Sequence, residues 1–249
     1  MKILVVNPNT TELMTERMLD VATAVAAPGT ELVGVTAARG VPYVASRAEA
    51  QLAGASVLEL IAEHGEGVDA VIVAAFGDPG LQAARELFDV PVVGMAEAAL
   101  LTACMLGDRF VLVTFSPTLT RWYADCVSLY GLDQRCGAIV VPDVGFATVE
   151  GVRSELRAPL VAAANEAVES GKGDVVILGG APLTGLANQV KGELLAPVVD
   201  PISAAVVQAE ALVRLGVCVT RQPTKPPGKP NSGLAPALAR AIARKHAGG

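Results

Sequence analysis

The sequence predicts an α/β protein made of two similar parallel-sheet lobes, with a site in the cleft between them. Short β-branched runs alternate with longer amphipathic stretches that are rich in Ala and Leu. Blocks of sequence from the first half of the chain recur in the second half. With 249 residues, of which 52% are hydrophobic, the chain can bury a sizeable core. Strands that are apolar on both faces and alternate with helices indicate parallel sheets covered on both sides.

Eight short apolar runs are predicted as strands, namely Lys2–Val6, Glu31–Thr36, Asp69–Ala75, Pro91–Gly94, Phe110–Thr114, Ala138–Val141, Asp174–Leu178 and Pro197–Val199. The segments between them carry apolar residues at helical spacing. The main predicted helices are Thr11–Ala26, Arg47–Glu63, Glu97–Leu106, Val152–Glu169 and Ser203–Leu215. Ligands of such sheets bind beyond the carboxyl ends of the strands, so the turns at those ends are the candidate site.

An internal repeat supports the two lobes. Val68–Leu81 recurs as Gly173–Leu186, and Pro91–Gly94 recurs as Pro197–Asp200. The first strand recurs more weakly as residues 109–114. In each of the three pairs the second copy follows the first by about 105 to 108 residues. The alternative to duplication is that these blocks are only generic strand-turn-helix patterns. Duplication predicts a first lobe of residues 1–104 plus about 200–220, and a second lobe of residues 105–199.

Residues 221–249 form a third region with a different composition. This region is Pro-rich and carries six basic residues and no acidic residue, whereas the rest of the chain has 13 bases against 25 acids. We expect an extended basic arm followed by a short helix near Ala235–His246. The arm is either a solvated tail or a contact to a neighbouring subunit, and we expect a homo-oligomer.

Composition excludes several classes of protein. The formal net charge of −6 argues against nucleic-acid binding. No apolar run approaches the roughly 18 residues of a spanning helix, and the first strand turns polar too early for a signal peptide. The cysteines and the two histidines show no metal-ligand spacing, which predicts no metal and free thiols in the cytoplasm. These residues are Cys104, Cys126, Cys136, Cys218, His64 and His246.

Two polar turns stand at equivalent strand ends. Asn7, Asn9 and Thr10 follow the first strand, and a second set, Thr114, Ser116 and Thr118, follows its counterpart. Backbone N–H groups at the start of the next helix suit an anionic ligand, which predicts a cradle for a carboxylate or imide. Helix capping alone is the alternative reading of these residues.

Two small-residue turns form a second equivalent pair, residues 74–80 and 179–185. Their small side chains allow a ligand to approach the backbone closely, but they match neither a Walker A loop nor a dinucleotide fingerprint. Asp78 is the ionisable group in these turns, although Asp before Pro is also an ordinary turn residue. Between the second strand and its helix, Tyr43 and Arg47 are candidates to face the cleft, and Ser46 is a natural helix cap. Glu97 is favoured in a first helical turn by the helix dipole alone.

Several of these blocks, in this order, resemble the hydantoin racemase branch of the aspartate/glutamate racemase superfamily over roughly residues 1–215. They are the strand ending in Asn7–Thr10, the turn Phe76–Leu81, the segment Pro91–Ala98, Val113-Thr114 and Leu178-Gly179. The resemblance implies two α/β lobes, a site between them and no cofactor. It also implies proton transfer at the carbon alpha to a carboxylate or cyclic imide carbonyl, with two cysteines acting from opposite faces.

The sequence departs from the family at those two cysteines, because Ala75 and Gly180 occupy their positions. The proton-transfer group must then be another side chain. Asp78 is the first candidate and Glu97 the second, followed by Tyr43 and Ser46. The expected substrate-holding residues are Asn7, Asn9, Thr10, Tyr43, Ser46, Phe76, Thr114, Ser116, Thr118, Gly179 and Ala181.

The expected function is therefore that of a cofactor-independent amino-acid or hydantoin-type racemase. The alternatives are a lyase or decarboxylase on the same scaffold, and a non-catalytic ligand-binding or maturation-factor protein. The expected partner is a small carboxylate or imide substrate, without nucleic acid or membrane.

Overall fold

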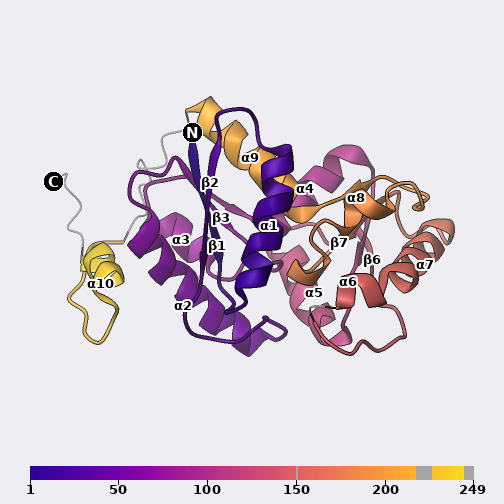
Figure 1. Cartoon of the computed structure of the whole chain (residues 1–249), viewed down its shortest axis with the longest axis horizontal. Helices are drawn as coiled ribbons and strands as arrows, with labels where there is room; N and C mark the ends of the chain where they lie inside the picture. Colours follow the sequence, from indigo (N-terminus) through magenta and orange to yellow (C-terminus); the bar gives the residue numbers. More distant parts are fainter. Residues whose placement is uncertain (150, 217–225, 244–249) are drawn as a thin grey trace.

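A computed structural model of the chain describes residues 1–149, 151–216 and 226–243, and these form two four-stranded parallel sheets (Figure 1). The first sheet has the order β2-β1-β3-β4 and the second the order β6-β5-β7-β8. The strands are β1 (Lys2–Asn7), β2 (Glu31–Thr36), β3 (Ala70–Val73), β4 (Val92–Gly94), β5 (Phe110–Val113), β6 (Cys136–Val140), β7 (Val175–Leu178) and β8 (Val198–Val199). Every predicted strand is present, with ends shifted by at most two residues.

The α-helices are α1 (Glu12–Val25), α2 (Arg47–His64), α3 (Leu81–Leu87), α4 (Met95–Leu106), α5 (Thr120–Leu129), α6 (Val152–Glu155), α7 (Arg157–Glu169), α8 (Leu186–Val190), α9 (Pro201–Leu215) and α10 (Pro236–Ala243). The helix predicted over residues 152–169 is two helices. Pro159 has no N–H to donate to the carbonyl of Glu155, so α6 ends there and α7 begins at Arg157.

The two sheets repeat one topology. β3 and β7 take the same third place in their sheets, and each pairs with the first strand of its own half on one side. Even the hydrogen bonds just beyond the strands correspond: Ala74 N donates to Val6 O at 2.8 Å, and Gly179 N donates to Val113 O at 2.8 Å. The internal repeat therefore reflects a structural duplication, as the sequence predicted.

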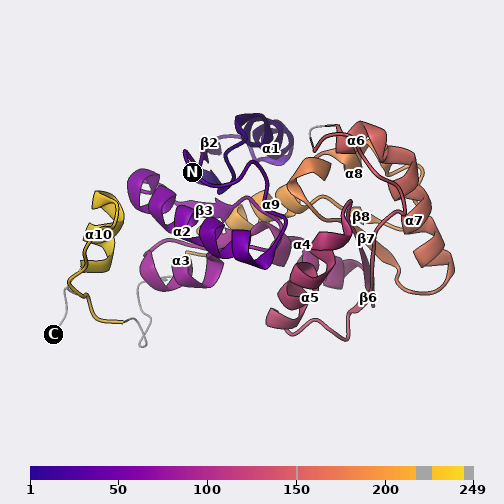
Figure 2. The same ribbon diagram turned by 90° about the horizontal axis from the view of Figure 1, so that it is seen from below.

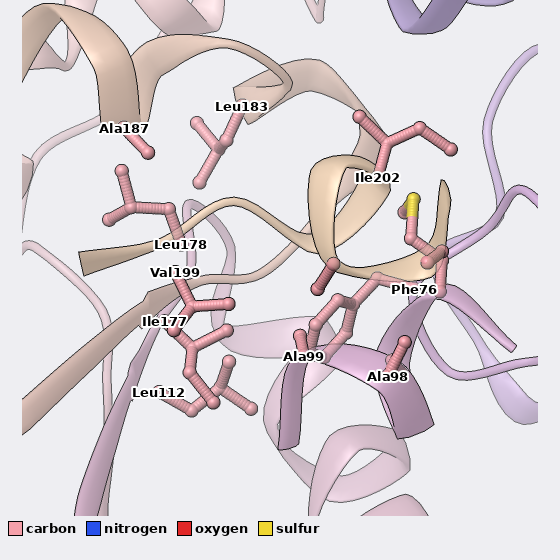
Figure 3. Close-up of a cluster of buried hydrophobic side chains, with 14 of the residues drawn as sticks. Phe76, Ala98, Ala99, Leu112, Ile177, Leu178, Leu183, Ala187, Val199 and Ile202 are labelled. Atoms are coloured by element: carbon pink, nitrogen blue, oxygen red, sulfur yellow. The ribbon is translucent and has the colours of Figure 1, made fainter. Parts of the chain in front are cut away.

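Two helices join the lobes through a common apolar core. α4 contacts α9 and also reaches β5, β7 and β8 of the second sheet, whereas α9 packs on α1, β3 and β4 of the first. The two helices lie at the centre of the molecule (Figure 2). Figure 3 shows Ala98 and Ala99 of α4 near Phe76, with Ile202 of α9 above them and Val199 of β8 beside Ile177 of β7. Gln208 Nε2 also donates to Ala98 O and Thr102 Oγ1, which ties α9 to α4.

The C-terminal helix lies at the edge of the first lobe. α10 packs against α2 of the same chain, where Leu238 is buried (Figure 1). Of the region predicted as a basic arm and short helix, residues 221–225 and 244–249 fall outside the described residues, as does Cys218. No helix within residues 1–149, 151–216 and 226–243 has the length and hydropathy needed to cross a membrane.

Candidate functional site

A small, partly open pocket lies between the carboxyl ends of the two sheets. The turns after β3 and β7, the loop after β2 and the helix α5 all contribute to it. Its cavity is about 20 Å³, roughly the space of one water molecule. It is lined by Asn9, Tyr43, Val44, Ala75, Phe76, Phe115, Trp122, Tyr123, Gly180, Ala181 and Pro182. Six of these were predicted as site residues: Asn9, Tyr43, Ala75, Phe76, Gly180 and Ala181.

Asn9 presents an amide to the pocket. Its Oδ1 accepts hydrogen bonds from Asn7 Nδ2 at 3.1 Å and from Thr11 N at 2.9 Å, which fixes the side chain. The hydrogen bonds of the described residues leave Asn9 Nδ2 without an acceptor. The amide can therefore donate to a bound carbonyl.

The loop that carries Tyr43 is held against this turn. Thr10 N donates to Val41 O at 3.0 Å, and Thr11 Oγ1 donates to Pro42 O at 2.7 Å. Tyr43 and Val44 consequently close one side of the pocket. The expected backbone cradle for an anion is wrong for this turn, because Thr10 N is used by the loop and Asn9 N donates to Asn7 Oδ1.

The two positions that the resemblance assigns to the family's cysteines line the same pocket from different lobes. Ala75 follows β3 and Gly180 follows β7, and both line the cavity. Gly180 has φ of +128°, a conformation that favours glycine, and a Cβ there would stand 2.8 Å from Phe115 Cε1. The second position is therefore shaped for glycine in this chain.

α5 supplies two aromatic walls that the sequence analysis missed. Tyr123 packs edge-on against Phe76, with ring centroids 4.8 Å apart. The indole of Trp122 covers Gly77 and separates the pocket from a larger hollow of about 590 Å³ between α2 and α5. A chain with one tryptophan and three tyrosines carries two of them side by side here, which was the available signal.

Asp78 lies outside the pocket and stabilises the start of α4. Its carboxylate accepts hydrogen bonds from Ala96 N at 2.8 Å, Glu97 N at 2.7 Å and Tyr130 Oη at 2.6 Å. Burial raises the pKa of Asp78 to about 6, against the lowering effect of these hydrogen bonds. Asp78 was the first candidate for proton transfer, but its carboxylate caps α4 and does not line the cavity.

Glu97 is likewise directed elsewhere. Both of its carboxylate oxygens are held by the guanidinium of Arg85, one of them at 2.9 Å from Nη1. Arg85 Nε also donates to Val92 O, so the Arg85–Glu97 ion pair is anchored to β4. The expectation that the start of α4 faces the cleft with Glu97 is not met by this geometry.

The remaining predicted residues support the site from outside. Asn7 is fully buried and donates to Thr15 Oγ1, and Ser46 caps α2 by accepting from Glu49 N. The hydroxyl oxygens of Ser116 and Thr118 lie 2.9 Å apart at the surface and share a hydrogen bond.

Three further predicted residues have structural roles. Gly179 lets Phe76 and Leu112 approach the backbone. Thr114 is buried at the end of β5, and Arg47 pairs with Asp125 of α5.

Within the described residues, no group of three or more His, Cys, Asp or Glu side chains could hold a metal ion. The described cysteines Cys104, Cys126 and Cys136 are free thiols, and none of them lines the pocket.

Comparisons with known proteins agree with this architecture. Residues 3–209 match the family model described as Asp/Glu/hydantoin racemase. A hydantoin racemase of Paenarthrobacter aurescens is 36% identical over 218 residues, which is 87% of this chain and 92% of that protein. The solved allantoin racemase of Klebsiella pneumoniae is 37% identical with a TM-score of 0.89, covering 95% of this chain and 98% of its own. The allantoin racemase of Pseudomonas fluorescens is 35% identical with a TM-score of 0.87, covering 94% and 100%.

Proposed function

Because this chain belongs to the Asp/Glu/hydantoin racemase family, we propose that it racemises a five-membered cyclic ureide of the hydantoin or allantoin class. The substrate would carry its exchangeable hydrogen on the ring carbon next to a carbonyl. The observation that carries the proposal is the pocket between the turns of Ala75 and Gly180, which holds no carboxylate and is walled by aromatic rings. The cavity of about 20 Å³ must widen to admit such a ring, and the ring would then lie against the aromatic walls with a ring carbonyl beside the free amide of Asn9.

The proton-transfer group on the first lobe is Tyr43 in this proposal. Of the four side chains considered from the sequence, Asp78, Glu97 and Ser46 are engaged outside the pocket, whereas Tyr43 lines it. Tyr43 would act as the base after its own hydroxyl proton has passed to solvent: the phenolate would take the proton from the ring carbon, and the C–H electron pair would pass into the adjacent carbonyl to give a planar enolate. A water molecule would then give a proton to the opposite face, which inverts the carbon. The hydroxide formed would take the proton from Tyr43, which restores the phenolate.

The reaction as proposed needs no cofactor and takes place in the cytoplasm, where free cysteines are the rule. A homo-oligomer is proposed from the large apolar side chains left exposed. Leu52 on α2 and Met105 and Leu106 at the end of α4 are 64%, 75% and 55% exposed. The lyase and the non-catalytic alternatives are not favoured by the relatives.

The test is racemisation of enantiopure allantoin and 5-methylhydantoin in deuterated water, followed by polarimetry and by loss of the ring C–H signal in NMR. We expect inversion together with deuterium incorporation, at a rate above that of the buffer alone. If neither allantoin nor 5-methylhydantoin shows inversion or deuterium incorporation, the proposed function is wrong.

A matched pair of variants tests the base. Tyr43→Phe should lower the exchange rate by about 100-fold or more, in the range of a lost general base. Ser46→Ala lies in the same loop but removes only a helix cap, so it should keep exchange within about threefold while costing about 1 kcal/mol of stability. Equal losses in the two variants would indicate that the loop, and not the Tyr43 hydroxyl, matters.

A further inference from the structure

The glycine at position 180 leaves a space that a neighbouring hydroxyl reaches. A Cβ placed on Gly180 would stand 3.5 Å from the Tyr123 hydroxyl oxygen. Tyr123 lines the pocket, is 2% exposed and is held by the edge of Phe76. Its hydroxyl is thus fixed beside the place where the family carries its second cysteine.

A second hydroxyl behind it has no partner. Thr114 Oγ1 is buried at the end of β5, and no atom of the described residues completes a hydrogen bond to it. Burial raises the pKa of the Tyr123 hydroxyl, and the neighbouring Thr114 hydroxyl opposes that rise, which places the two hydroxyls side by side. A buried hydroxyl left unpaired is unfavourable, and the neighbouring Tyr123 hydroxyl is the group that can accept its hydrogen bond once Tyr123 donates to a ligand.

The protonation state of Tyr123 sets what it can do. Burial raises the pKa of the Tyr123 hydroxyl above its usual range. The group therefore keeps its proton at neutral pH, which suits a hydrogen-bond donor and excludes a general base.

We propose that Tyr123 is a catalytic residue that donates a hydrogen bond to the enolate oxygen of the ureide, on the Gly180 side of the pocket, with Thr114 donating in turn to Tyr123 Oη. This inference rests on the proposed function. The O–H bond of Tyr123 does not break: the ring C–H bond breaks, its proton goes to Tyr43, and its electron pair becomes the charge on the carbonyl oxygen that Tyr123 stabilises. A donor placed at a developing oxyanion acts mainly on the transition state.

The experiment measures turnover and binding separately in Tyr123→Phe. Hydantoin itself is the exchange substrate, with its ring CH₂ followed by NMR in deuterated water. Barbiturate, a planar cyclic ureide that carries enolate charge on its oxygens, is the binding probe, compared with neutral hydantoin by calorimetry. Tyr130→Phe is the matched control, since it removes another buried tyrosine hydroxyl that donates to Asp78 outside the pocket.

Tyr123→Phe should lower kcat for exchange by about 100-fold with KM changed less than about threefold, in the range of one lost oxyanion donor. It should weaken barbiturate binding at least about tenfold more than hydantoin binding. Tyr130→Phe should leave both measurements within about threefold. Thr114→Val should lower kcat by a smaller factor, with rescue by Thr114→Ser, as expected of a positioning residue.

The outcomes separate the two proposals. A wild-type protein without exchange or racemisation overturns the proposed function. If the wild type is active and Tyr123→Phe exchanges at the same rate, the role of Tyr123 is overturned alone. Equal weakening of barbiturate and hydantoin binding, or no binding of barbiturate by the wild type, also overturns it whatever the turnover.

Discussion

The carboxylate of Asp78 occupies the space that a side chain at Gly94 would fill. A Cβ built on Gly94 would lie 2.4 Å from Asp78 Cγ, and that carboxylate accepts from the first N–H groups of α4. In the second lobe the position equivalent to Gly94 is Asp200, which caps α9 itself and also accepts from Gly185 N at 2.9 Å. Both lobes thus place one carboxylate between the turn and the helix start, but the two lobes supply it from opposite sides of that junction.

The first prediction concerns the pH dependence of stability. The pKa of Asp78 is raised from 3.8 to about 6 in the folded chain. Its protonated form is therefore favoured by folding, and this contribution is fully present below about pH 4 and lost as the pH rises through 6. It amounts to roughly 3 kcal/mol. Urea unfolding of the wild type and Asp78→Asn should show the wild type losing stability relative to the variant between pH 4 and 7. A difference that does not change with pH would contradict this.

The second prediction concerns restoring thiols. Ala75→Cys should leave the free energy of unfolding within about 1 kcal/mol, since the backbone there already carries a Cβ. Gly180→Cys should cost about 1–3 kcal/mol because φ of +128° is strained for any other residue and the Cβ meets Phe115. Gly180→Ala is the control, because it adds the strained Cβ without a thiol. Thermal unfolding of the three variants measures these changes in stability. A fully stable Gly180→Ala would show that the turn relaxes freely.

The third prediction concerns substrate size. Trp122 separates a cavity of about 20 Å³ from one of about 590 Å³, so Trp122→Leu should join them. The ratio of kcat/KM for 5-benzylhydantoin over 5-methylhydantoin should then rise at least about tenfold, or roughly 1.4 kcal/mol. Leu129→Ala is the control, because Leu129 lines only the larger hollow and is 65% exposed. An unchanged ratio in Trp122→Leu would mean that the indole does not limit the substituent.

The fourth prediction concerns the ion pair across the lobes. Arg47 on α2 donates to both carboxylate oxygens of Asp125 on α5, at 2.5 and 2.7 Å, and both side chains are more than half exposed. Solvent screening should keep the contribution of this ion pair to stability small despite the good geometry. A double-mutant cycle with Arg47→Ala and Asp125→Ala, repeated in 1 M salt, measures the coupling between the two side chains. A large coupling that survives 1 M salt would show that the pair is effectively shielded from water.

The sequence predicts the strands well and the side-chain roles less well, for a physical reason. A run such as Val175–Leu178 is apolar on both faces, so its place in a covered parallel sheet follows from local composition. The role of Asp78 depends on contacts with Glu97 and Tyr130, which are 19 and 52 residues away along the chain. No feature of the neighbouring sequence distinguishes a carboxylate that caps a helix from one that acts as a general base.

Tyr123 and Trp122 were missed for a related reason. On an isolated amphipathic helix, aromatic residues are expected to pack in the core of their own lobe. Only the docking of the two lobes turns Trp122 toward Gly77 of the first lobe and Tyr123 toward Phe76. Asn9 and Tyr43 were found because they follow strand ends, where a ligand is expected.

The exchange of helices between the lobes has a consequence for the origin of the chain. α4 closes the first half of the sequence yet covers the second sheet, and α9 closes the second half yet covers the first. A polypeptide of one half alone would leave one face of its sheet bare, and two such polypeptides would cover each other by trading their last helices. The chain thus has the architecture of a domain-swapped homodimer whose two copies became joined end to end, after which each copy was free to lose or replace its own catalytic groups.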